Sequence, residues 1–349
     1  MKLLMVARRF APDVQSGTET VFGKLYDEAR RAGHEVRLVA GFRRDRALVP
    51  PECVAVDLRG RGASAWAVMA WAAAAEARRF RPDAVLSNSI EVVVPGVPVV
   101  TIVHDLNFGG AGQGAAATAR RAFYRAQSRA LRRVVAVSEV TRQALLGAGI
   151  AADKVVVVHN GVDLERFVPG AGPAAGLLRL VHVSRVLPGK GQHASLDALG
   201  RLRPDQRRDV RLSIVGAVAD GIYADQLRVS AHKLPVDFFF DVPDVVPHYR
   251  SASMALFPTL MPEGFGYAAV EAMACGLPVV GYEEPAVREA TGGIAVLVAR
   301  DDPAALRDAI LRLSADPAER ARLGEAGRAF VQRYRWDRCW QGYERVLLD

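Results

Sequence analysis

Residues 254–276 read MALFPTLMPEGFGYAAVEAMACG, and this stretch decides the fold. The apolar run at 254–257 is typical of a short buried strand. A proline and two glycines then predict a tight loop over 263–266, with a helix that begins near Tyr267. Gly276 is a natural stop for that helix, because glycine readily adopts the left-handed conformation that follows a helix end. The stretch therefore predicts strand, tight loop and helix in direct succession.

The same alternation runs through the whole chain. Short Val-rich runs separated by longer helical patterns indicate parallel sheets that are covered on both faces. Two such series predict an α/β protein with two doubly wound, Rossmann-like domains. The predicted strands are 3–7, 36–40, 84–86, 99–103, 134–137 and 155–158 and, after a break, 180–183, 211–215, 238–240, 254–257, 278–281 and 295–298.

The length and composition agree with two globular domains. The chain has 349 residues, of which 50% are hydrophobic and 24% charged, which excludes a disordered, collagen-like or coiled-coil protein. The stretch VPGAGPAAG at 168–176 has the composition of a linker. It predicts domains at 1–167 and 168–334, followed by a helix at 335–349 whose apolar residues recur every three to four positions.

The positive charge is confined to the first part of the chain. Residues 1–154 hold 23 Lys+Arg against 14 Asp+Glu (23 − 14 = +9), and residues 155–349 hold 23 against 24 (23 − 24 = −1). Such asymmetry indicates an anionic partner for one domain. Codon bias of a GC-rich genome is the alternative reason for the many arginines, but it does not explain why they gather in one domain.

The cysteines and the apolar runs favour a cytoplasmic protein without a membrane span. Cys53, Cys275 and Cys339 are far apart and odd in number, so neither a disulfide framework nor a cysteine metal site is expected. Uncharged runs such as 62–75 are shorter than the roughly 20 residues that cross a bilayer. Peripheral attachment to the inner face of the plasma membrane stays open.

Two common nucleotide-binding motifs are missing from the sequence. No GxGxxG follows the first predicted strand and no GxxxxGK[ST] occurs, which argues against a dinucleotide oxidoreductase and a P-loop NTPase. The first strand leads instead to Ser16, a plausible helix cap, and Gly17, beside which a ligand can approach the backbone. That helix start suits an anion. Both residues are also routine at helix starts.

Two carboxylates flank the tight loop of the second series. Glu263 lies in the loop and Glu271 lies about one turn inside the helix. Free N–H groups and the helix dipole suit a diphosphate, while carboxylates accept hydrogen bonds from paired sugar hydroxyls. Glu263 as a mere helix cap and Glu271 as a surface residue are the alternative. The spacing of both with the glycines argues against it.

This stretch resembles the Glu-x₇-Glu signature of family-4 retaining glycosyltransferases with the GT-B fold. Further segments resemble the same family in the same order, and together they cover nearly the whole chain. The segments are GHEV at 33–36, VHD at 103–105, VS at 137–138, HNGVDLERF at 159–167, SRVLPGKG at 184–191 and the run 240–259. The resemblance implies two facing doubly wound domains, with a C-terminal helix that crosses back to the first.

The resemblance also implies a role for each matching residue. Arg185 and Lys190 match the pair that binds the donor diphosphate, and two cations at a loop–helix junction suit a departing diphosphate in place of a metal. Two surface basic residues are the alternative. The remaining implied roles are the nucleotide ribose for Glu271, the donor-sugar hydroxyls for Glu263, and backbone N–H donors to sugar and phosphate for Gly264, Phe265 and Gly266.

His104 follows a predicted strand of the first domain and matches the histidine that lies near the reacting sugar. It is expected to position the sugar and stabilise charge, with Asp105 beside it. A hydrogen-bonded structural histidine is the alternative. The sequence departs from the family pattern at Ser16, Gly189, Asp241 and the stretch YEEP at 282–285, and the last departure leaves the donor sugar open.

The sequence thus predicts a retaining, metal-independent glycosyltransferase without a cofactor. It would move a hexose-type sugar from a UDP- or GDP-sugar to a hydroxyl acceptor, which is a glycan, a glycolipid or a small metabolite. The alternatives are another GT-B enzyme, such as a nucleotide-sugar epimerase or a phosphorylase, and a non-catalytic nucleotide-sugar-binding protein. An NAD enzyme is disfavoured by the missing glycine motif.

Arginine clusters in the first domain suggest an anionic membrane surface or an anionic acceptor. Trp66, Met69 and Trp71 offer an interfacial face nearby. The alternative is a solvated arginine face beside a core helix. Nucleic acid is not expected, because no basic patch is interleaved with aromatic residues. The arginines are 121, 125, 129 and 132 on one predicted helix, and 43, 44, 46, 59 and 61 around a loop.

Overall fold

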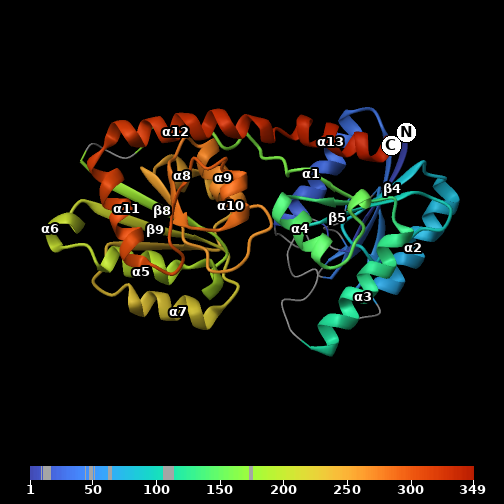
Figure 1. Cartoon of the computed structure of the whole chain (residues 1–349), viewed down its shortest axis with the longest axis horizontal. Helices are drawn as coiled ribbons and strands as arrows, with labels where there is room; N and C mark the ends of the chain where they lie inside the picture. The colour runs from blue at the N-terminus through green and yellow to red at the C-terminus, as the bar shows by residue number, and fades with distance from the viewer. Residues whose placement is uncertain are drawn as a thin grey trace. The chain divides into compact units, whose positions relative to one another are not determined.

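The computed structural model describes residues 1–8, 10, 17–43, 45–46, 50, 52–61, 65–104, 114–172 and 176–349. The chain divides into two compact units; Figure 1 shows the first in blue to green together with the red helix at the C-terminus, and the second in yellow-green to red. The first unit holds residues 1–161 and the C-terminal residues 336–349, and the second holds residues 162–335. The boundary between the units therefore lies before the linker predicted at 168–176, and the predicted division at 167/168 is placed a few residues too late.

The first unit is built on a parallel sheet. Within the described residues this sheet has seven strands in the order β3-β2-β1-β4-β5-β6-β7. Its strands are β1 (Lys2–Ala7), β2 (Glu35–Phe42), β3 (Val54–Asp57), β4 (Ala84–Ser87), β5 (Val99–Val103), β6 (Arg133–Ala136) and β7 (Val155–Val157). Its helices are α1 (Gly17–Arg31), α2 (Ala65–Phe80), α3 (Ala115–Ala130), α4 (Glu139–Gly147) and α13 (Trp336–Leu348).

The C-terminal helix α13 packs on α1 of the first unit, as the fold class predicted. His34, which follows α1, contacts Glu344 of α13 through Nε2 and Oε1 at 2.7 Å. The His34 ring also lies 5.5 Å from the Trp340 ring, centroid to centroid. Trp340, Tyr343 and Leu347 are buried, so the apolar spacing of this helix did identify its packed face.

The second unit repeats the plan. Among its described residues, six parallel strands lie in the order β10-β9-β8-β11-β12-β13. Its strands are β8 (Leu178–Val183), β9 (Val210–Gly216), β10 (Val236–Phe240), β11 (Met254–Phe257), β12 (Val279–Tyr282) and β13 (Val296–Val298). Its helices are α5 (Gln192–Gly200), α6 (Pro204–Arg207), α7 (Gly221–Ser230), α8 (Val246–Arg250), α9 (Tyr267–Ala274), α10 (Pro285–Ala290), α11 (Pro303–Ala315) and α12 (Pro317–Val331).

The strand order of each unit reverses once, and this reversal marks where a ligand fits. In the second unit the chain extends from β8 toward β10 on one side and from β11 toward β13 on the other. In open parallel sheets, ligands bind beyond the carboxyl ends of the two strands at such a reversal. The loops that follow β8 and β11 are therefore the place to look for a site.

Helix α2 does not present the interfacial face that the sequence suggested. Met69 is fully buried in the core of the first unit, and Trp66 lies beneath the Arg8 guanidinium, whose carbon is 4.3 Å from the ring centroid. Only Trp71 of the three is exposed, at 73%. Within the described part of the chain, no helix is long and apolar enough to cross a membrane.

Candidate functional site

The loops after β8 and β11 are joined by hydrogen bonds into one surface. The Leu260 N–H donates to the Gly189 carbonyl at 2.8 Å, and the Thr259 Oγ1 lies 3.3 Å from the same carbonyl oxygen. Gly191 adopts a φ of +76°, and a Cβ there would lie 1.9 Å from the Pro258 carbonyl oxygen. Only glycine fits at this position, so the loops approach as closely as backbones can.

Lys190 and Glu263 meet across these two loops. The Lys190 Nζ lies 2.6 Å from the Glu263 Oε1, and the side chains are 14% and 11% exposed. The Thr259 hydroxyl donates to the same oxygen at 2.9 Å. The sequence assigned the two residues separately to a diphosphate and to a sugar. The structure places a cation and a hydrogen-bond acceptor side by side at the reversal of strand order.

The helix that follows Glu263 begins without a side-chain cap. Gly266 caps α9 at a φ of +88°, and in this fully described stretch no side chain caps the helix. Phe265 is buried, with its ring 5.2 Å from the Tyr334 ring. Because this ring anchors the loop in the core, the backbone of residues 264–266 is held at the start of α9, where the helix dipole favours an anion.

Glu284 is a site residue that the sequence reasoning did not single out. It is buried, it precedes α10, and its Oε2 accepts a hydrogen bond from the Val287 N–H at 3.1 Å. Its other oxygen accepts from the Glu263 N–H at 3.3 Å. An acidic residue before Pro285 is a recognisable start signal for a helix, so the cap was predictable, but its contact with Glu263 was not.

Glu271 lies on α9 with a tyrosine as its partner. The Tyr249 hydroxyl lies 3.3 Å from the Glu271 Oε2 and 3.1 Å from the Ala268 carbonyl oxygen, so its one proton is shared between these two acceptors. Burial raises the pKa of Glu271 to about 7, although the Tyr249 hydroxyl and the positive charge of Arg166 oppose the rise. Glu271 therefore changes protonation near neutral pH, which the sequence did not predict.

Arg185 follows β8 and is exposed. The Gln192 side chain fixes the backbone beside it, donating to the Arg185 carbonyl at 2.8 Å and to the Ser184 hydroxyl at 2.9 Å. The Arg185 guanidinium is thus presented on the same loop as Lys190, but it does not take part in the Lys190–Glu263 ion pair.

Asp241, a departure from the family pattern, has a φ of +55°, and its side chain accepts a hydrogen bond from the Val218 N–H at 3.0 Å.

The candidate residues of the first unit lie on other elements. His104 follows β5, and its Nε2 is enclosed without a hydrogen-bond partner among the described residues. Burial lowers the pKa of His104 to about 4, so the imidazole is neutral at physiological pH. Gly17 is the first residue of α1 and is exposed. Ser16 and Asp105 lie outside the described residues.

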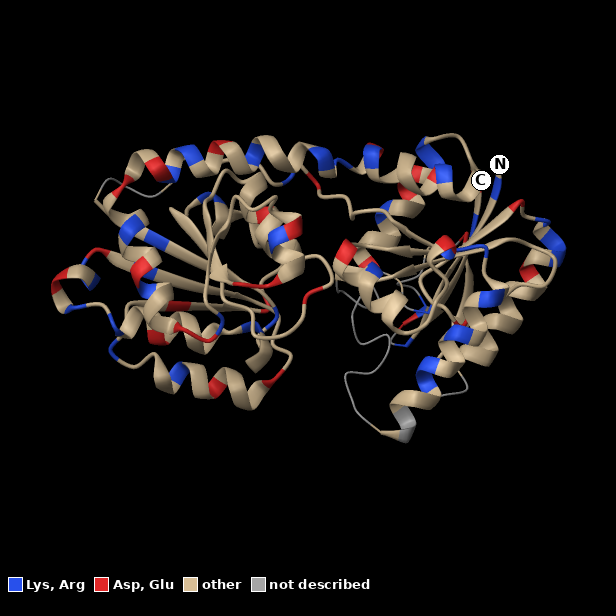
Figure 2. Cartoon of the chain, viewed as in Figure 1, with Lys and Arg blue, Asp and Glu red and all other residues tan. Residues whose placement is uncertain are grey.

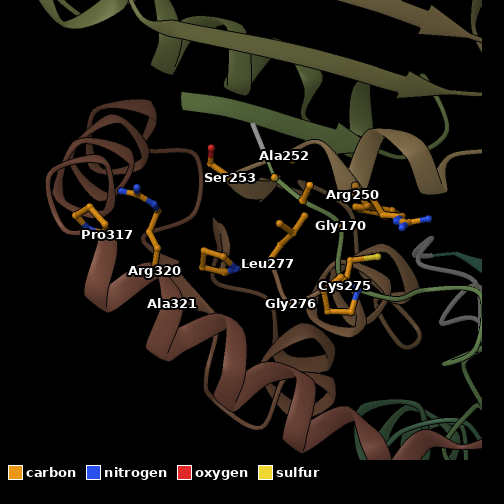
Figure 3. Close-up of a pocket in the computed structure, with 15 residues that line it drawn as sticks. Gly170, Arg250, Ala252, Ser253, Cys275, Gly276, Leu277, Pro317, Arg320 and Ala321 are labelled. Atoms are coloured by element: carbon orange, nitrogen blue, oxygen red, sulfur yellow. The ribbon is translucent and has the colours of Figure 1, made fainter. Parts of the chain in front are cut away.

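A cavity of about 300 Å³ opens at the other end of the second sheet (Figure 3). Ser253 and Pro278, which line it, directly precede β11 and β12, whereas Lys190 and Glu263 come after strands. The Arg320 guanidinium at its rim donates to the Ser314 carbonyl at 2.8 Å. This cavity is therefore separate from the site at the carboxyl ends.

The described residues contain no cluster of three or more His, Cys, Asp or Glu side chains that would hold a metal ion.

Two doubly wound units, with the C-terminal helix returned to the first, define the GT-B class of glycosyltransferase folds. Residues 172–330 match the family model described as "Glycosyl transferases group 1", and residues 15–166 match "Glycosyltransferase Family 4". The chain therefore belongs to the family-4 glycosyltransferases of group 1, as its sequence motifs indicated.

The curated relatives of this chain are also described as glycosyltransferases. A D-inositol 3-phosphate glycosyltransferase from Streptomyces bingchenggensis is 33% identical over 219 residues, which are 55% of this chain and 47% of the relative. A protein of the same description from Catenulispora acidiphila is 34% identical over 260 residues, which are 64% of this chain and 60% of the relative. The matched part of the chain thus spans only about half the length of the first of these relatives.

Solved structures share the fold over the full chain. The Anabaena protein HepE, in complex with UDP and glucose, superimposes with a TM-score of 0.80 at 20% identity, covering 100% of this chain and 99% of HepE. Sucrose-phosphate synthase from Thermosynechococcus elongatus gives a TM-score of 0.82 at 19% identity, covering 99% and 98%. At these identities the likeness shows the GT-B fold.

Proposed function

We propose that the protein transfers a hexose-type sugar, with retention of configuration, from a UDP- or GDP-sugar to a hydroxyl acceptor. The observation that carries this proposal is the Lys190–Glu263 pair at the reversal of strand order, beside the uncapped start of α9. The pair places a cation for a diphosphate next to a carboxylate for sugar hydroxyls. The complex of HepE with UDP and glucose supports a nucleotide-sugar donor for this fold.

In the proposed reaction, the bond between the sugar C1 and the β-phosphate oxygen breaks. The acceptor oxygen attacks C1 from the same face, and its proton passes to the leaving phosphate. Lys190 and Arg185 neutralise the negative charge that develops on the diphosphate. The diphosphate takes over the ammonium of Lys190 while the sugar hydroxyls donate to Glu263, so that both groups keep a partner. His104, kept neutral by burial, is proposed to position the reacting sugar.

Turnover of the donor tests the proposal. We expect one nucleoside diphosphate to be released when the protein is incubated with a UDP- or GDP-hexose and a hydroxyl acceptor, with the anomeric configuration of the product unchanged in its NMR spectrum. Appearance of an epimerised donor without acceptor would identify an epimerase instead. Binding of the donor without any turnover would identify a non-catalytic binding protein.

Nucleotide binding is expected to strengthen as the pH rises through 7. Glu271 is proposed to accept hydrogen bonds from the ribose hydroxyls, which only the carboxylate form does fully. Burial raises the pKa of Glu271 to about 7, so the Glu271 carboxyl is mostly protonated below pH 7 and mostly ionised above it. Between pH 6 and pH 8 the dissociation constant measured by calorimetry should fall by up to about tenfold.

The Tyr249→Phe variant separates this effect from other titrations. The Tyr249 hydroxyl holds the pKa of Glu271 down, so its removal should move the midpoint of the pH dependence upward. The Glu271→Gln variant should bind weakly at every pH. A pH profile that stays the same in both variants would show that Glu271 does not contact the nucleotide.

We propose that the transfer needs no metal ion, because Arg185 and Lys190 supply the positive charge. Turnover should therefore stay within about twofold after treatment with EDTA and be unchanged by added Mg²⁺ or Mn²⁺. The control is the Lys190→Ala variant, in which added Mg²⁺ should not restore turnover. Loss of activity in EDTA that a divalent cation restores would contradict this part of the proposal.

Helix α3 supports the further proposal that the first unit docks on an anionic membrane. Among its described side chains only Ser128 is buried, and the outward side carries an apolar stripe that includes Phe123, 46% exposed. Arginines line one edge of this stripe, and no acidic residue occurs in the helix. Figure 2 shows the blue arginine positions along α3. The stripe consists of Ala119, Ala122, Phe123, Ala126 and Ala130, and the arginines are 121, 125 and 129.

An apolar stripe edged by arginines fits the interface of an anionic lipid bilayer. A second copy of the chain is a poorer occupant, because it would bring arginine edges of like charge together. We expect the protein to sediment with phosphatidylcholine vesicles that contain phosphatidylglycerol, less so at high salt. Reversal of Arg125 and Arg129 to Glu should reduce this binding at least about tenfold.

The matched control reverses two exposed arginines of the second unit, Arg208 and Arg312, to Glu. This control changes the net charge equally and should leave vesicle binding within about twofold. Equal loss in both double variants would show only a net-charge effect. A wild-type protein that stays in the supernatant with every vesicle would reject membrane docking.

A further inference from the structure

The donor-sugar side of the site contains a second buried carboxylate. Glu284 and Glu263 come from the loops after the neighbouring strands β12 and β11. They are joined directly, because the Glu263 N–H donates to the Glu284 Oε1 at 3.3 Å. The side chains of both residues are almost fully enclosed. The Glu284 carboxylate thus lies against the Glu263 peptide. Burial and, to a lesser degree, the Glu263 charge raise the pKa of Glu284, so the two carboxylates interact where solvent screens their charges weakly.

The ammonium of Lys190 pairs with one of the two carboxylates, Glu263. Lys190 contacts Glu263 at 2.6 Å, whereas both oxygens of Glu284 accept from backbone N–H groups. Two guanidiniums on neighbouring segments are engaged elsewhere. Arg288 donates from Nε to the Glu283 Oε1 at 2.7 Å, and Arg300 donates to the Leu260 carbonyl. Among the ion pairs of the described residues, Lys190 is therefore the partner of Glu263, and Glu284 has backbone partners alone.

Binding of a donor would draw this ammonium away from Glu263. The diphosphate competes for the Lys190 ammonium, which leaves Glu263 in need of hydrogen-bond donors. Hydroxyl groups of a neutral sugar supply such donors. A carboxylate on the sugar supplies none and adds a like charge beside two buried carboxylates, which solvent screens weakly.

We propose that Glu284, acting with Glu263, selects donors whose sugar is neutral and rich in hydroxyl groups and rejects donors of uronic acids. This inference rests on the proposed function, and it names the sugar class for the same site. Glu284 acts in two ways: it fixes the Glu263 peptide against the start of α10, and it adds a negative charge beside it. Glu284 is therefore a positioning and specificity residue rather than a catalytic one.

Paired donors with the same base test the inference. UDP-glucose is compared with UDP-glucuronic acid, and GDP-mannose with GDP-mannuronic acid, by calorimetry and by donor turnover. The wild-type protein should prefer the neutral member of the productive pair by at least about 10²-fold in kcat/KM. The Glu284→Gln variant removes the charge at nearly constant size. Its preference should fall by about tenfold or more, mostly through a lower KM for the uronic acid donor.

The neighbouring residue provides a matched control. Glu283 is exposed and pairs with Arg288, so the Glu283→Gln variant removes the same charge one residue away and should keep the wild-type preference. If the wild-type protein uses the uronic acid donor as well as the neutral one, the inference is wrong and the proposed function stands. If no donor of either pair binds, the proposed function itself fails. The wild-type comparison decides the inference even if Glu284→Gln does not fold.

Discussion

Replacement of Lys190 by alanine is expected to reduce sugar transfer by about 10²–10³-fold. The ammonium would stabilise the departing diphosphate, and its loss removes a charge-assisted contact that strengthens as the leaving group develops charge. The loss should appear mainly in kcat. Folding should survive, because Glu263 keeps its hydrogen bond from Thr259 at 2.9 Å. Steady-state kinetics with the productive donor and circular dichroism measure the two effects.

The matched control for this variant is Arg201→Ala. Arg201 is an exposed cation at the far end of α5, the helix that follows Lys190, and it pairs with Asp197. Its removal lowers the charge of the same segment by the same amount and should leave kcat within about twofold. Near-normal transfer by Lys190→Ala would show that the diphosphate binds elsewhere.

Replacement of Glu263 by glutamine is expected to reduce kcat/KM by a similar factor, about 10²–10³-fold. The amide is a weaker acceptor for sugar hydroxyls. If the amide turns its NH₂ group toward Lys190, two hydrogen-bond donors face each other. Because the two residues form one ion pair at 2.6 Å, their effects should not be independent. The double variant should lose less than the product of the two single losses.

Double-mutant kinetics over wild type, the two single variants and the double variant provide this measurement. Glu283→Gln is the control for removal of a carboxylate from the exposed surface nearby. Fully multiplicative losses would show that Lys190 and Glu263 act at separate points. Unchanged transfer by Glu263→Gln would remove Glu263 from the donor site.

The sequence predicted the fold well where strands are continuous and buried. The runs at 99–103 and 254–257 appear as β5 and β11 with the same limits. Strand β3 (Val54–Asp57) was missed, because it is a four-residue edge strand that is mostly not buried. The second unit begins at Val162, before the stretch whose linker composition set the predicted division at 167/168.

The sequence named most residues of the candidate site one by one, but it did not predict their arrangement. Lys190 and Glu263 are far apart in the sequence, and only the adjacency of β8 and β11 brings them into contact. Glu284 and Tyr249 were missed because each acts through a partner on another segment. Their role depends on buried tertiary contacts, which no local pattern contains.

The most direct test of the central claim is calorimetric titration of wild-type protein and the Lys190→Ala variant with UDP, GDP, ADP and dTDP. The central claim is that the loops after β8 and β11 hold a nucleoside diphosphate. It predicts that UDP or GDP binds the wild-type protein with one site, and that Lys190→Ala weakens this binding at least about tenfold. Equal affinity of the two proteins, or no binding of any nucleotide, would contradict it.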